Sequence, residues 1–395
     1  MRCGKIFIFV LCFFLWAQAS RATVFASDTA WTEETAVNED ETLGKLVDEM
    51  IGDEKGFGQV QEILNSELEE NGFDIRETIY TLIQGEDALD ISHLLEQVKK
   101  CIYQQVTGNV WLWKQCFVLA VFSAVFAKIG SSFENQFMAQ TGTYIGYLFM
   151  FSIFLSTFSS LFSSAQNALD AILNFMKALF PIYFMTTGAA VGQAMATGGY
   201  QVALLVISGA ELIMGNILLP MVEVYFFMVL LNHLTEEHML EGILEILETA
   251  IKWGIKIVLG CVIGLNAIQG LLLPAISNVK NHALLQAGES IPVVGQTLLG
   301  VTERVLGMCG LIRNAGGAAG IFGALLVGLY PVVKIGIVAL VLKLESAMMR
   351  PMGETQISEC MGQVAKSAAL LCYVLLVTVL LFVLTLLLLS YSLRV

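Results

Sequence analysis

The sequence predicts an all-α fold: a polytopic α-helical membrane protein of seven or eight spans with a small, acidic, exported helical segment. Of its 395 residues, 56% are hydrophobic and 14% are charged, against about 45–50% and 25% in soluble domains. The run from Leu370 to Leu389 contains no charged residue, and about 20 apolar residues span a bilayer as a helix. Residues 28–108 hold 20 acidic and 5 basic side chains, and the rest of the chain holds 14 and 16.

The N-terminus has the pattern of a secretory signal. Arg2 and Lys5 precede an apolar run over 6–16, and Ala17 and Ala19 are small residues suited to cleavage. We therefore expect a signal peptide over residues 1–26, with an uncleaved anchor as the alternative. In either case residue 28 onward begins on the non-cytoplasmic side.

The acidic segment, residues 27–108, shows apolar stripes at helical spacing after a Glu- and Asp-rich leader. The stripes lie over 60–68, 79–83 and 91–102, and Asp74 followed by Glu77 resembles a capping pair. We expect two or three short amphipathic helices. Their apolar sides pack on one another, on the membrane body or on a partner, so the segment is either a self-contained cap or a docking surface.

The remaining residues, 109–395, form the predicted polytopic membrane domain. The candidate spans are 110–130, 143–165, 172–195, 201–231, 252–273, 317–342 and 368–392. Span 201–231 is long, and we expect either a tilted helix broken at Pro220 or a span running into an interfacial helix. The stretch 274–316, which begins with Pro274, is predicted to be amphipathic, re-entrant or an eighth span.

Orientation rests on two connecting segments. Residues 343–366 carry three basic side chains, which places them in the cytoplasm by the positive-inside rule. Residues 233–250 carry five Glu and no Lys or Arg, which permits a location on the outer side. Both assignments hold only if 274–316 crosses the membrane, so the sequence leaves the span count and the side of the C-terminus open.

The motifs of common enzyme sites are absent from the sequence. It contains no G-x-x-x-x-G-K-[ST] loop, no H-E-x-x-H and no G-x-S-x-G. His233 and His238 are spaced so that a helix would turn them to different faces, and no C-x-x-C pair occurs. We therefore expect no enzymatic activity, no cofactor and no metal, and the acidic exported segment argues against nucleic acid as a partner.

Several polar side chains fall inside the predicted spans, where a charge costs about 2.5–3.5 kcal/mol on insertion scales. They should face the bundle interior, a water-filled path or a partner helix, so they are candidates for translocation or for interhelical packing. These residues are Glu211, Asn216, Glu223, Asn266, Gln269 and Lys334.

Three small-x-x-x-small pairs permit close approach of helices. They are Gly188 with Gly192, Gly260 with Gly264, and Gly316 with Gly320. Packing within one chain is favoured over oligomerisation as their role.

Three consecutive pieces of the chain form a distinctive pattern: Glu-Ser-Ile-Pro-Val-Val-Gly over 289–295, Val-Thr-Glu-Arg-Val-Leu-Gly over 301–307 and Leu-Ile-Arg-Asn-Ala-Gly-Gly over 311–317. These pieces resemble the stage III sporulation protein AE family. The layout of signal peptide, acidic segment and multi-span body is also similar. The candidate gating or family-motif residues in these pieces are Pro292, Gly295, Glu303, Arg304, Arg313 and Asn314.

The resemblance implies a membrane component of the assembly that links mother cell and forespore during sporulation. It implies a place in the outer forespore membrane of the mother cell, beside other membrane and ring-forming proteins and a separate ATPase, with membrane lipid around it. Members are regarded as permease-like channel subunits that support forespore development. Two alternatives remain: a stand-alone secondary transporter that uses Glu211 and Glu223 for ion coupling, and a non-transporting scaffold that recruits partners through its exported segment.

Overall fold

The computed structural model describes residues 54–67, 74–83, 136–191, 193–234, 240–288, 294–350 and 355–392, with single positions between 99 and 118. All belong to the second of two compact units, Asp53–Val395. The predicted signal peptide, the stripe over 91–102 and, apart from single positions, the span over 110–130 lie outside this part of the chain.

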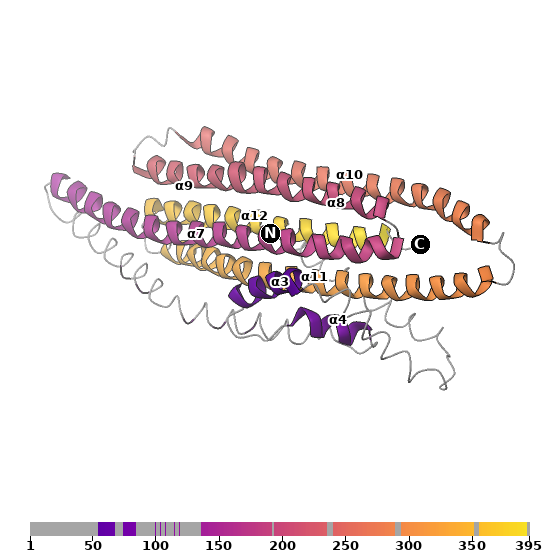
Figure 1. Ribbon diagram of the computed structural model, residues 1–395. Helices are drawn as coiled ribbons and strands as arrows, with labels where there is room; N and C mark the ends of the chain where they lie inside the picture. Colours follow the sequence, from indigo (N-terminus) through magenta and orange to yellow (C-terminus); the bar gives the residue numbers. More distant parts are fainter. Residues whose placement is uncertain are drawn as a thin grey trace. The chain divides into compact units, whose positions relative to one another are not determined.

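Every element in the described residues is helical, as the sequence predicts (Figure 1). Two short helices come first, and seven consecutive elements form the body. The elements are α3 (Glu54–Glu67), α4 (Ile75–Ile83), α7 (Gln136–Val191), α8 (Gln193–Ala210), η1 (Glu211–Leu218), α9 (Leu219–Leu234), α10 (Glu241–Gly288), α11 (Val294–Met349) and α12 (Thr355–Ser392).

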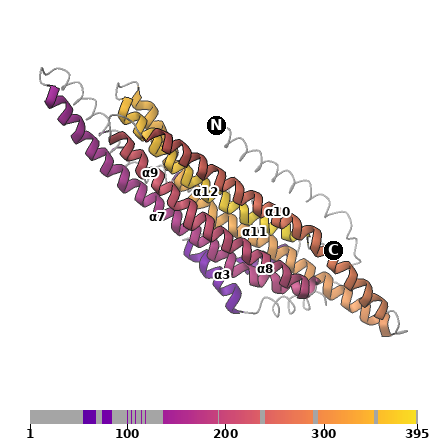
Figure 2. The same ribbon diagram turned by 90° about the horizontal axis from the view of Figure 1, so that it is seen from above.

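Helix α12 is the centre of the body, and α7, α9, α10 and α11 all pack against it (Figures 1 and 2). Its large apolar side chains, such as Leu371, Leu375 and Phe382, are fully buried. The segment predicted to be the most hydrophobic span is therefore the helix that the other helices surround.

Five stretches in the described residues are long and apolar enough to cross a bilayer, so seven or eight spans are not confirmed. They are Tyr147–Gly188, Ala196–His233, Glu241–Ile268, Gly310–Met349 and Ile357–Ser390. The expected spans 201–231 and 317–342 lie inside two of these stretches, and most of 252–273 and of 368–392 lies inside two others.

The two expected spans 143–165 and 172–195 are corrected by the structure. Residues 166–171, which the prediction left as a connection, continue the single helix α7. Helix α7 ends at Val191 and α8 begins at Gln193, so both bounds fall inside the second expected span. Because the polar side chains of 166–171 are matched by buried Ala168, Leu169 and Ala171 on the other side, the stretch is an amphipathic helix rather than a loop.

The stretch 274–316 is also different from the prediction of a separate amphipathic or re-entrant segment. Helix α10 continues through Pro274 to Gly288, and α11 begins at Val294. Residues 274–288 are therefore the C-terminal part of one helix, and residues 294–316 are the N-terminal part of the next.

Pro220 changes the hydrogen bonding of its helix without breaking the chain's helical path. Proline has no amide hydrogen, so the carbonyl four residues earlier loses its usual partner. The preceding turn is the π-helix η1, in which the amide of Leu219 donates to the carbonyl of Met214, five residues back. Such widened turns are frequent at functional sites, and η1 carries two of the predicted polar residues.

The two described helices of the predicted exported segment dock on the body. Val60 and Leu64 of α3 and Ile75 and Ile79 of α4 are buried, with α3 against α7 and α4 against α11. Asp74 caps α4 as predicted, since its Oδ1 accepts from the amide of Arg76 at 2.8 Å. Of the three predicted partners for these apolar stripes, the structure shows packing on the body and contact of α3 and α4 with one another.

Candidate functional site

The relative heights of the helices are fixed by close contacts at glycines of α11. A Cβ at Gly317 would lie 3.3 Å from the ring of Tyr183 in α7 and 3.6 Å from Oγ of Ser390 in α12. Farther along α11, Gly323 meets Phe175 of α7 and Gly336 meets Cys372 of α12. Both α7 and α12 therefore run antiparallel to α11 and parallel to each other, with position 183 level with position 390.

One exposed side of α7 is polar over three turns. Gln166, Asn167, Asp170, Asn174 and Lys177 are all exposed, at the spacing of one helix face. The opposite side of the same turns is buried against the other helices of the body: Ala165, Ala168, Leu169, Ile172, Leu173, Phe175 and Met176.

These polar residues lie at the depth of the most apolar part of the molecule. They precede Tyr183 by 6 to 17 positions, so by the helix register they are level with residues 373–384 of α12. That interval falls inside the uncharged run from Leu370 to Leu389. Polar side chains at such a depth face water or protein rather than lipid.

The π-helix η1 adds two of the predicted residues to this surface. Glu211 accepts a hydrogen bond and ion pair from Nζ of Lys177 at 2.8 Å, with the side chains 49% and 42% exposed respectively. Asn216 is exposed on the same element. We call the set Gln166, Asn167, Asp170, Asn174, Lys177, Glu211 and Asn216 the polar face.

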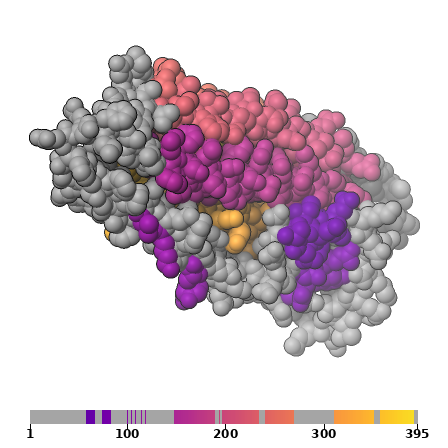
Figure 3. Space-filling view, turned by 90° about the vertical axis from the view of Figure 1, so that its left-hand side faces the viewer, coloured from indigo at the N-terminus to yellow at the C-terminus, as the bar shows by residue number. Residues whose placement is uncertain are grey.

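Large apolar side chains are exposed elsewhere at about this level, with Lys256 of α10 exposed among them. Leu205 of α8 and Ile257 of α10 are each 57% exposed, and Leu212, the neighbour of Glu211, is 58% exposed. The contrast shows that the polar face is a local feature of α7 and η1. Figure 3 shows α7, in purple and magenta, at the surface with the indigo atoms of α3 and α4 on the same side.

The other predicted polar residues lie elsewhere. Asn266 is buried between α10 and α12, where its Nδ2 donates to the carbonyl of Val262 at 2.8 Å and lies 3.4 Å from Oγ1 of Thr385. Glu223 is half-buried on α9. Lys334 donates to Oγ of Ser164 at 3.3 Å and links α11 to α7. The side chain of Gln269, on α10, lies outside the described part of the chain.

The family-motif residues are not part of the polar face. Arg313 is buried on α11, and its Nη2 donates to Oδ1 of the half-buried Asn314 at 3.2 Å. Gly295, Glu303 and Arg304 belong to α11, but their side chains lie outside the described residues, as does Pro292 altogether.

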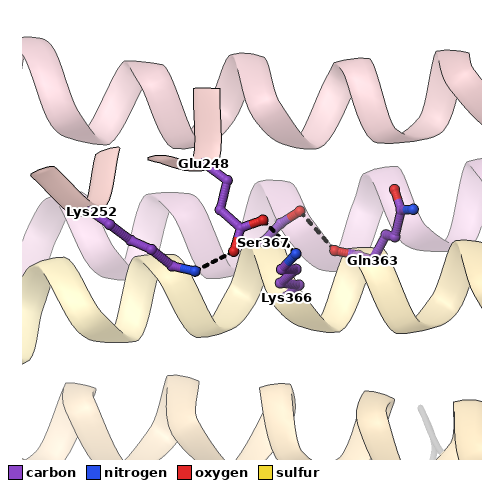
Figure 4. A network of polar contacts seen from close by, with 5 residues as sticks. All are labelled: Glu248, Lys252, Gln363, Lys366 and Ser367. Carbon is purple, nitrogen blue, oxygen red and sulfur yellow. Dashed lines mark hydrogen bonds and ion pairs between the residues drawn. The ribbon is translucent and has the colours of Figure 1, made fainter. Parts of the chain in front are cut away.

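A charged cluster ties α10 to α12 away from the polar face (Figure 4). The carboxylate of Glu248 accepts from Lys252, one turn along α10, and from Lys366 of α12. Its side chain is only 12% exposed, whereas the two lysines are about half exposed. A carboxylate enclosed in this way between two cations serves as a crosslink between helices.

The three small-residue pairs have different surroundings. Gly320 packs against α7, where a Cβ would lie 2.7 Å from Leu179, and Gly188 faces Ala196 at 3.4 Å. The first and last pairs therefore contribute to packing within the chain, as favoured from the sequence. A Cβ at Gly260 or Gly264 would meet no atom within 4 Å, so that pair has no such role in the described structure.

Sequence reasoning identified Glu211 and Asn216 but missed the five polar residues of α7. The prediction treated Gln166 to Asp170 as the edge of a span, since polar clusters often mark loops. Their spacing of one, four, eight and eleven positions from Gln166 is the signal of one helix face.

The fold and the polar face define a multi-span α-helical membrane protein with hydrophilic side chains at the depth of its apolar helices. The family model described as "Stage III sporulation protein AE" matches residues 73–392. The chain therefore belongs to the stage III sporulation protein AE family.

One relative is stage III sporulation protein AE of Bacillus subtilis (strain 168). It is 20% identical over 310 residues, which are 78% of each chain. No solved structure matches the chain.

Proposed function

We propose that this protein is the permease-like membrane subunit of a sporulation assembly, and that its polar face lines a hydrophilic passage through the membrane. The observation that carries the proposal is the depth of the polar face, level with residues 373–384 of α12. A lipid-facing surface there would be apolar, as it is at Ile257 and Ile263 of α10.

The position of α3 supports a water-facing side. Leu64 of α3 lies 3.7 Å from the Cβ position of Gly323, a glycine that also contacts Phe175 of α7. The outer side of α3 exposes Gln59, Glu62 and Asn65. A helix with this polar surface beside α7 is compatible with water and not with hydrocarbon.

The orientation follows from the same elements. The α9–α10 and α11–α12 connections lie at one end, since Glu248 near the start of α10 pairs with Lys366 in the N-terminal part of α12. Basic residues lie near that end: Lys252, Lys343, Arg350 and Lys366. By the positive-inside rule this end is cytoplasmic. Leu64 of α3 lies beside Gly323, 23 positions along α11 from Ser346 and level with the polar face.

This orientation corresponds to six spans, namely the predicted span 110–130 and the five apolar helices. The first would return the chain to the cytoplasm before α7, and the C-terminus would lie on the non-cytoplasmic side. In the mother cell's outer forespore membrane, that side faces the forespore. Energy would come from a separate ATPase, and membrane and ring-forming proteins of the assembly would be the partners.

The docking of α3 favours a passage over a pure scaffold. A scaffold that recruits partners through the exported segment needs accessible apolar stripes there. Val60 and Leu64 are instead fully buried on the body, so these apolar side chains contact the same chain and are not accessible to a partner.

The test is the water accessibility of single cysteines in membranes. Asn167→Cys and Asn174→Cys should react with a membrane-impermeant thiol reagent, while Ile257→Cys, exposed at a similar level of α10, should not. The unsubstituted chain measures the background from native cysteines. Equal reaction at all three positions, or none at the two asparagine positions, would contradict a passage along the polar face.

A functional test accompanies it in a spore-forming host. Replacing Asn167 and Asn174 together with Leu should reduce spore yield at least about tenfold without lowering the amount of protein in the membrane, because the passage loses its hydrogen-bonding lining. Replacing Ile257 with Leu is the matched control. Normal sporulation of the double variant would count against the proposal.

A further inference from the structure

The charges of the polar face do not cancel, and the one that is left unpaired belongs to a single residue. Four members carry neutral carboxamides: Gln166, Asn167, Asn174 and Asn216. Lys177 and Glu211 neutralise each other in their 2.8 Å ion pair. Asp170 is left, exposed on α7 and without an ion-pair partner in the described part of the chain.

Asp170 is also placed where its charge has most effect. By the register through Gly317 it is level with residue 377 of α12, near the middle of the uncharged run. Gln166, Asn167 and Asn174 occupy the positions one helical turn away, where Cβ atoms are about 5–6 Å apart. Along this face of α7 the carboxylate is therefore flanked by amides, and Lys177, seven positions further on, is paired with Glu211. Lys334 of α11 binds Ser164, six positions before Asp170.

A single fixed charge controls which ions enter a narrow, low-dielectric passage. Low-dielectric walls focus the field of a charge into the water between them, and acidic residues at such positions favour cations over anions. The neighbouring amides offer both donors and acceptors, which replace part of the hydration of uncharged polar solutes.

We propose that Asp170 is the charge-selecting residue of this passage, so that cations and uncharged polar solutes pass in preference to anions. The inference rests on the proposed function, because it requires the polar face to be wet. It adds the class of solute and the residue that sets it.

The experiment measures selectivity at a cysteine one turn from Asp170. Asn174→Cys is treated in native membranes with a cationic and an anionic methanethiosulfonate reagent of similar size, and the ratio of the two rates is determined. The measurement is repeated with Asp170→Asn and with Asp170→Lys. Glu241→Gln, an exposed acidic residue at the start of α10, is the matched control for loss of one negative charge.

The ratio of cationic to anionic rate should fall about threefold or more in Asp170→Asn, since a unit charge at this spacing acts on both reagents with opposite sign. It should fall further in Asp170→Lys and stay unchanged in Glu241→Gln. If both reagents react and the ratio is the same in all variants at position 170, the proposed selectivity is wrong, while the proposed passage still stands. Absence of reaction with either reagent contradicts the proposed function itself.

Discussion

At the residue scale, glycines set how closely α11 approaches its neighbours. A Cβ at Gly323 would lie 2.7 Å from the ring of Phe175, whereas one at Gly316, on the same helix, would meet nothing within 4 Å. Alanine is a better helix former than glycine by about 1 kcal/mol. The same substitution should therefore have opposite effects at these two positions.

We expect Gly323→Ala to destabilise the protein by about 1–3 kcal/mol, because the inserted methyl displaces Phe175 from α7. Gly316→Ala should be neutral or slightly stabilising. Thermal unfolding of the purified protein in detergent measures both. Equal stability of the two variants would show that α7 and α11 are not in the contact described.

Some of the polar residues in the helices could be identified from the sequence, and others could not. Glu211 and Asn216 stood out because a charge or amide inside an apolar stretch is rare. Asp170 did not, since it lies in the short connection 166–171 between two expected spans, and Asn174 did not, since it lies near the start of the expected span 172–195. Whether such a residue faces water or a partner depends on side chains from other helices, as for Lys177 with Glu211 and Asn266 with Thr385.

At the element scale, α7 is the largest departure from the prediction. A span count based on windows of about 20 residues divides a long apolar stretch wherever polar residues interrupt it. Helix α7 contains 56 residues with Pro181 inside, and its polar interruption has helical spacing. Window averages discard that spacing, so they find the apolar pieces and lose the continuity between them.

The continuity of α7 predicts a long distance. Spin labels at Phe149→Cys and Met185→Cys, both at exposed positions, should be separated by about 54 Å, since the helix rises about 1.5 Å per residue. Pulsed electron paramagnetic resonance measures this separation. Two antiparallel spans joined at 166–171 would bring the labels within about 20 Å, which would restore the sequence-based assignment.

Docking of α3 is the second prediction at this scale. Leu64→Asp places a charge in the fully buried contact with α7 and α11, which costs several kcal/mol unless the helix leaves its site. We expect the segment before α7 to become sensitive to limited proteolysis on the non-cytoplasmic side. Glu62→Gln, on the exposed side of α3, is the control, and equal protection of both variants would argue against the docked position.

At the scale of the whole molecule, the ends of the helices determine which connections share a side. The sequence allowed residues 233–250 and 343–366 to lie on opposite sides. The contact of Glu248 with Lys366 and the paired bonds between Ser346 and Ser358 bring both connections to one end. Charge counting treats each loop by itself, so it had no means of detecting this constraint.

The shared end predicts a labelling pattern in intact cells. Glu241→Cys and Arg350→Cys should both be protected from an impermeant maleimide, and Gln193→Cys, at the start of α8, should be labelled. All three positions are exposed in the structure. Labelling of only one of the first two would show that the α9–α10 and α11–α12 connections are on different sides.

The burial of α3 has a consequence for how the protein is made. Its apolar side chains rest on α7 and, through Leu64, beside Gly323 of α11, a residue that the ribosome adds 259 positions later. Until α11 is inserted, the leading helices have no complete site to occupy, and unburied apolar surface of this kind favours aggregation. Biogenesis therefore requires the first segment to be kept apart from other chains until nearly the last helix has arrived.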